Sequence, residues 1–202
     1  MTKDSIAAAR DDIEFLRGLA EDGPGAMARD GALLVTIGAI FSVVTFFYFL
    51  TMSGAVVVPV FVEQGAWIGG VVLMIATGPW LRSRFAQGRS AASRAVRAGM
   101  TSVGVGLTVA GLGFLLASWR LGAPDFILQA FPVAMFTLYG AAWSVAFAAR
   151  RRTWMLLVAW GCFAAALALG FFAGSPIAWL VMSAGLLTLV AAPGYAMVKG
   201  KA

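Results

Sequence analysis

Few residues of this 202-residue sequence have side chains that commonly carry out chemistry. Histidine is absent, which removes the commonest metal ligand and the usual general base near neutral pH. The single cysteine, Cys162, lies inside an apolar stretch, so we expect a small packing residue and no disulfide within the chain. No Cys-x-x-Cys pair, Gly-x-Ser-x-Gly turn or phosphate-binding glycine loop occurs. We therefore predict no catalytic residue, no metal site and no cofactor, and we do not expect an enzyme.

Three charged residues beside apolar stretches form the first candidate site. Glu63, Arg120 and Asp125 are predicted to lie on one face of a membrane, where they could form a small charge cluster. The second apolar stretch could begin as early as Val56 or as late as Gln64. Only the early start draws Glu63 into the membrane, where a charge costs at least a few kcal/mol. The alternative is a plain loop position for Glu63.

A run of arginines between residues 82 and 97 forms the second candidate site. Clustered arginines attract anionic lipid headgroups. They are also the usual signal that fixes the orientation of a membrane protein. Both interpretations stay open for this segment. The candidate contacts to anionic lipid are Arg82, Arg84, Arg89, Arg94 and Arg97.

The segment before the first apolar stretch forms the third candidate site. Its apolar residues recur in steps of three and four, which predicts an amphipathic cytoplasmic helix from about Ser5 to Asp22. Acids outnumber bases in it, whereas helices that bind anionic lipid are rich in lysine and arginine. We expect its apolar seam to contact protein, either a partner or the chain's own basic segment at 82–97. The seam residues are Ile6, Ala9, Ile13, Leu16 and Ala20.

Long apolar segments must position all of these residues. The sequence is 61% apolar and 12% charged, whereas soluble domains have about 25% charged residues. A helix needs roughly 20 apolar residues to cross a bilayer, and lipid forces backbone groups to bond within the segment. We predict an all-α polytopic membrane protein with six transmembrane helices. It divides into a helix and linker at 1–30, a bundle at 31–198 and a tail at 199–202, with spans at about 31–51, 64–81, 99–119, 126–149, 154–173 and 177–197.

The basic residues predict the orientation of these spans. All of the 15 lysines and arginines except Arg120 fall on one side of the predicted membrane. Cytoplasmic loops are enriched in these residues, so we predict that both termini are cytoplasmic. This distribution also explains the net charge of +6 without nucleic acid, which we do not expect as a partner.

Tryptophans and small residues add two expectations about packing. Trp154 falls at a predicted cytoplasmic boundary, while Trp143 and Trp160 lie deeper and are expected to pack within the bundle. Small residues at helix-packing spacing permit close approach of helices, within the chain or in an oligomer. They are Gly65 with Gly69, Gly170 with Gly174, and Gly140, Ser144 and Ala148, with a less regular set at Gly104, Gly106, Gly111 and Gly113.

Two stretches resemble a group of uncharacterised bacterial six-span inner-membrane proteins. They are ARDDIEFLRGLAEDG at 9–23 and LYGAAWSVAFAARRRTWMLLVAWG at 138–161. The resemblance implies a location in a bacterial inner membrane, and it implies no activity or site residues.

These observations favour a non-catalytic function. We expect an accessory, scaffold or regulatory subunit that acts through contacts with another membrane or cytoplasmic protein, or as a homo-oligomer, and that also contacts membrane lipids. The alternative is a small transporter or channel for a lipophilic or weakly polar compound. Such a path would use apolar walls and hydroxyls such as Thr108, Thr137 and Ser144.

Overall fold

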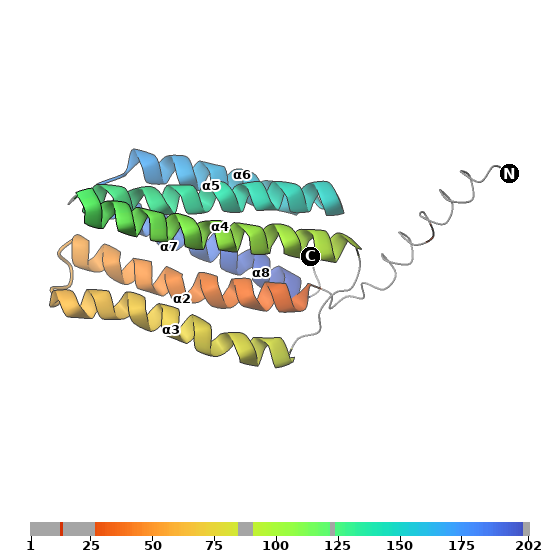
Figure 1. The fold of residues 1–202 in the computed structure, drawn as a ribbon, viewed down its shortest axis with the longest axis horizontal. Coiled ribbons are helices and arrows are strands. Elements are labelled where there is room, and N and C mark those ends of the chain that lie inside the picture. The colour runs from red at the N-terminus through yellow and green to blue at the C-terminus, as the bar shows by residue number, and fades with distance from the viewer. Residues whose placement is uncertain (1–12, 14–26, 85–90, 122–123, 200–202) are drawn as a thin grey trace.

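A computed structural model of the protein describes residue 13 and residues 27–84, 91–121 and 124–199, with the backbone alone for 82, 91, 92 and 124–129. Most of these residues are helical (Figure 1). The helices are α2 (Ala28–Met52), α3 (Val60–Arg84), α4 (Ala91–Leu121), α5 (Pro124–Arg150), α6 (Thr153–Phe171), α7 (Pro176–Gly185), the π-helical segment η1 (Leu186–Ala191) and α8 (Ala192–Val198).

Six helical stretches within the described residues are long and apolar enough to cross a membrane. The last of them joins α7, η1 and α8 into one stretch from Pro176 to Val198, which we call the sixth span. This confirms the predicted all-α class and the six candidate transmembrane helices. The second helix begins at Val60, so Glu63 lies in its first turn and not in a loop. The predicted N-terminal helix lies outside the described residues, apart from Ile13.

The six helices pack in two groups of three. In the first group, α2 lies between α3 and the sixth span; in the second group, α5 lies between α4 and α6. The groups meet mainly where α6 packs on α7 and η1. Figure 1 shows that α2 begins and α8 ends at the same end of the bundle. We call this the basic end, because Arg29, Arg94, Arg150 and Lys199 lie there, and we call the opposite end the far end.

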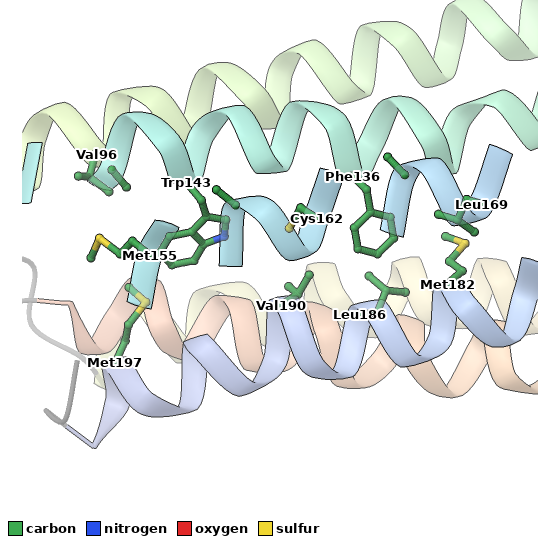
Figure 2. Packing of buried hydrophobic residues seen from close by; sticks show 13 residues of the cluster. Val96, Phe136, Trp143, Met155, Cys162, Leu169, Met182, Leu186, Val190 and Met197 are labelled. Atoms are coloured by element: carbon green, nitrogen blue, oxygen red, sulfur yellow. The ribbon is translucent and has the colours of Figure 1, made fainter. Parts of the chain in front are cut away.

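The core lies between the two groups. Figure 2 shows Phe136 and Trp143 of α5 pointing toward the sixth span, with Met155 and Cys162 of α6 beside them. These four side chains are fully buried. Cys162 therefore packs in the core, as its apolar surroundings in the sequence predicted.

The closest helix contact joins α2 to the sixth span. A Cβ atom at Gly38 would lie 2.7 Å from the Ala191 nitrogen and 2.8 Å from the Leu186 oxygen. Pro193 accounts for the π-helical turn beside this contact, because proline has no N–H and its ring clashes with the carbonyl four residues earlier. The widened turn brings the backbone of η1 against α2, where only glycine fits.

Candidate functional site

Three hydroxyls lie in the buried contact between α2 and the sixth span. The Ser42 hydroxyl donates to the Ser183 carbonyl at 3.0 Å, and the Ser183 hydroxyl donates to the Ser42 carbonyl at 2.9 Å. The two hydroxyl oxygens are 3.1 Å apart. Thr45 is fully buried and donates to the Phe41 carbonyl at 2.8 Å. Each hydroxyl in this set, the hydroxyl cluster, thus has a partner within the protein, as is usual for polar groups between transmembrane helices.

Three aromatic donors lie together in the second group, and we call them the aromatic cluster. The Trp143 ring of α5 is 6.1 Å from the Tyr139 ring and 5.2 Å from the Trp154 ring of α6, edge-on in both pairs. Trp143 is fully buried. The Tyr139 Oη, Trp143 Nε1 and Trp154 Nε1 atoms are all buried. The Trp143 indole N–H and the Tyr139 hydroxyl interact with each other. Figure 2 shows the Trp143 nitrogen on the side of the ring toward Cys162.

A set of charges joins the two groups at the basic end. Asp30, in the first turn of α2, is half-buried and interacts electrostatically with Arg97 of α4 and Arg150 of α5. The Arg150 guanidinium also donates a hydrogen bond to the Ser93 hydroxyl of α4. These charges lie beside the core cluster, which includes Val96 of α4 and against which Met27 packs, so charge and apolar packing both lie where the start of α2 meets the second group.

The predicted anionic-lipid contacts do not share one environment. The Arg84 guanidinium lies 5.7 Å from the centre of the Trp80 ring, a cation–π distance. Arg94 is exposed on α4, whereas Arg97 is half-buried near Asp30. The side chain of Arg82 and all of Arg89 lie outside the described residues. Lipid binding by these arginines stays a prediction.

The predicted far-end cluster is described only in part. Glu63 is half-buried in the first turn of α3 and interacts electrostatically with Tyr48 of α2. Arg120 is exposed in the last turn of α4. Asp125 belongs to the first turn of α5, and its side chain lies outside the described ones. The grouping of these three residues stays a prediction.

The predicted N-terminal seam falls almost wholly outside the described residues. Ile13 is helical and 64% exposed. The other seam residues, Ile6, Ala9, Leu16 and Ala20, are not described, so the contacts of the seam stay a prediction.

Some of the small residues pack against another helix and others have open space around them, and the sequence does not distinguish the two kinds. A Cβ at Gly140 would lie 2.8 Å from Phe163, so this glycine packs within the chain as expected. The glycines around which an added Cβ would meet nothing within 4 Å include Gly65, Gly69, Gly104, Gly106, Gly113, Gly170 and Gly174. Sequence reasoning missed the tightest contacts of glycines with backbone atoms of another helix, at Gly31, Gly38 and Gly194. The spacing of Gly31, Gly38, Ser42 and Thr45 along one helical face is the signal that could have found them.

The three hydroxyls predicted to line a transport path form hydrogen bonds within their own helices. The hydroxyls of Thr108, Thr137 and Ser144 each donate to the carbonyl four residues earlier in their own helix. Thr108 and Thr137 are exposed on the outside of the bundle.

Trp160 is 65% exposed, so the expectation that it packs within the bundle is wrong. It lies on the face of α6 opposite the core.

Comparison of the chain with family models, with curated proteins and with solved structures found no match. Within the described residues, no three His, Cys, Asp or Glu side chains come together where they could hold a metal ion.

Proposed function

We propose that this protein is an accessory, scaffold or regulatory subunit that acts through contacts with another protein, or with a second copy of itself, in a bacterial inner membrane. The outward glycines of the peripheral helices carry this proposal. Gly65 and Gly69 of α3 and Gly104 and Gly113 of α4 have open space where a side chain would lie. Glycine weakens a helix relative to alanine, whereas small residues let a neighbouring helix approach closely. A helix from another chain would give these glycines the close contact that Gly38 has within the protein.

The charge distribution supports a cytoplasmic location for the basic end and for both termini. The predicted N-terminal helix then lies on the same side as Asp30, Arg94 and Arg97, where its seam is available to a cytoplasmic partner. Fusions of a reporter enzyme that is active only outside the cytoplasm test this orientation. We expect activity from a fusion in the α2–α3 connection near Gly54 and none from a fusion after Ala202. Activity from the C-terminal fusion would contradict the orientation.

Bulky substitution of the outward glycines tests the proposed contacts. Gly69→Leu leaves the fold intact because nothing lies within 4 Å of the added Cβ, and it blocks close approach of another helix. Ala164→Leu is the matched control, since Ala164 is exposed on α6. We expect cross-linking in native membranes to capture the same neighbour with the unaltered chain and with Ala164→Leu, and to lose it with Gly69→Leu.

Two results would contradict the proposal. One is a chain that emerges alone from native membranes after cross-linking. The other is a captured neighbour that survives Gly69→Leu, Gly104→Leu and deletion of residues 1–22.

A transporter or channel for a lipophilic or weakly polar compound is the alternative function. The three hydroxyls predicted to line its path bond to their own helices, and two of them face outward. The positions of these hydroxyls favour an accessory subunit over a transporter or channel. Uptake of candidate compounds into proteoliposomes would reverse this preference.

A further inference from the structure

Three aromatic rings from three helices converge toward the far end of the first group. The Tyr48 ring of α2 lies 6.0 Å from the Trp67 ring of α3 and 5.0 Å from the Trp179 ring of α7. All three side chains are half-buried, so each keeps part of its surface open to the surroundings of the bundle. We call these three residues the far-end ring group.

The core holds the two tryptophans of this group in place. Trp67 lies 5.6 Å from the Phe41 ring, and both tryptophans pack against the buried core cluster. A ring that is already fixed by packing loses little conformational freedom when it binds a ligand. A tryptophan that only anchors a helix at the membrane surface faces lipid by itself, as Trp119 does at 84% exposed. The far-end ring group is instead a set of rings in mutual contact.

A carboxylate adds negative charge beside these rings. Glu63 lies half-buried in the first turn of α3, one helical turn before Trp67, and it interacts electrostatically with Tyr48. The faces of aromatic rings are also negative, because of their quadrupole. The rings and the carboxylate therefore attract a cation together.

The chain itself places cations on aromatic rings at the basic end. The Arg84 guanidinium lies 5.7 Å from the centre of the Trp80 ring, and the Lys199 ammonium lies 4.7 Å from the centre of the Tyr195 ring. Each of these cations lies over one ring. A cation is attracted within about 6 Å of a ring centre, and the far-end rings are no more than 6.0 Å from Tyr48. One cation beside Tyr48 therefore interacts with more than one ring.

The position of the rings limits the chemistry of that cation. Tyr48 lies four residues before Met52, where α2 ends, which is about 6 Å along the helix. Lipid headgroups and dissolved compounds both reach this depth. Aromatic rings typically recognise quaternary ammonium groups, whose methyl groups pack on the ring faces.

We propose that the far-end ring group and Glu63 bind the ammonium group of an organic cation, which is supplied either by a lipid headgroup or by a soluble compound. This site is independent of the partner contacts proposed above, because none of its residues is an outward glycine.

Thermal unfolding with tetramethylammonium chloride as the probe tests the site. The protein is kept in a nonionic detergent, which has no ammonium group of its own, and sodium chloride at equal ionic strength is the reference. We expect the probe to raise the unfolding midpoint in a saturable way, by about 2 to 4 °C at a concentration about five times its Kd. Equal midpoints in the two salts would overturn the proposal.

Substitutions assign the effect to these residues. Glu63→Gln keeps the shape of the side chain and should weaken binding of the probe by up to about fivefold. Tyr48→Leu removes the central ring and should weaken it by about 2- to 30-fold. Trp119→Leu is the matched control, because it removes an exposed ring outside the group, and it should leave the affinity unchanged.

The affinity is read from the shift that the probe causes, so a variant with a lower midpoint of its own still reports on the site. Unchanged affinity in both Glu63→Gln and Tyr48→Leu would overturn the proposal.

The source of the ammonium group follows from the same measurement in lipid discs. Phosphatidylglycerol has no ammonium group, whereas phosphatidylcholine has one. A shift in phosphatidylglycerol discs that is absent in phosphatidylcholine discs identifies a lipid headgroup, because the headgroup then already occupies the site. A shift in both kinds of disc identifies a soluble cation. No shift in phosphatidylglycerol discs would overturn the proposal.

Discussion

The hydroxyl cluster and the aromatic cluster are both buried between helices, yet only the first reaches the backbone of a neighbouring helix. Ser42 and Ser183 reach each other's backbone carbonyls because α2 and the sixth span approach closely at glycine. Trp143 instead interacts with the Tyr139 hydroxyl of its own helix, and its ring packs edge-on against the Trp154 ring. Short hydroxyls beside a close backbone contact join helices through hydrogen bonds, whereas large rings keep the helix backbones apart and join α5 to α6 through ring contacts.

The largest effect is predicted for a substitution that breaks the close helix contact beside the hydroxyl cluster. Gly38→Ala puts a Cβ atom 2.7 Å from the Ala191 nitrogen, so we expect it to lower the free energy of unfolding by about 1 to 3 kcal/mol. Gly69→Ala is the control, because its Cβ meets nothing, and alanine should leave stability unchanged or raise it by up to about 1 kcal/mol. Denaturant titration in detergent measures both. Equal effects would show that the α2 contact is not specific to glycine.

A smaller effect is expected from the hydroxyls themselves. Ser42→Ala should lower the free energy of unfolding by about 0.6 kcal/mol, the average measured for hydrogen bonds between transmembrane helices, and by no more than about 1.7 kcal/mol, the largest value measured. Ser183→Ala should cost a similar amount, and the double variant should cost less than the sum, because each serine bonds to the other. Additive losses in this double-mutant cycle would mean that the two hydroxyls act separately.

The smallest predicted effect concerns the charges at the basic end. Asp30→Asn removes a carboxylate whose burial costs more free energy than its attraction to Arg97, Arg29 and Arg150 returns. We therefore expect the free energy of unfolding to stay unchanged or to rise by up to about 1 kcal/mol. The gain should grow in high salt, because ions screen the attraction that offsets the cost of burial. Denaturant titration at low and high salt measures the effect, with Glu63→Gln at the far end as the control, and a clear loss of stability would show that the arginines outweigh burial.

The sequence predicted the parts of the fold that depend on local apolar length. Six spans follow from runs of about 20 apolar residues, and the helix ends differ because alanine and arginine continue a helix beyond its apolar part, as in α4 from Ala91. Glu63 was left between a loop and a helix, although Pro59, directly before Val60, is a residue type that marks a helix start.

The sequence did not predict which helical faces meet. Gly65 and Gly69 have the same spacing as well-packed pairs, but α3 turns them outward, while Gly31 and Gly38 of α2 lie tightly against the backbone of the sixth span. Spacing shows which residues share a face and not what that face touches. The aromatic cluster was missed for the same reason: Tyr139 and Trp143 are one turn apart in sequence, but the contact of the Trp143 ring with the Trp154 ring depends on how α6 packs on α5.

The most direct test of the contrast between the clusters is an experimental structure, at a resolution that shows ordered water, of the protein purified with its native lipids. We expect direct contact at 3.1 Å, without intervening density, between the Ser42 and Ser183 hydroxyls, and the Trp143 Nε1 atom facing the Tyr139 hydroxyl. A molecule inserted between the two serines, or a Trp143 N–H bonded to the backbone of another helix, would contradict the account.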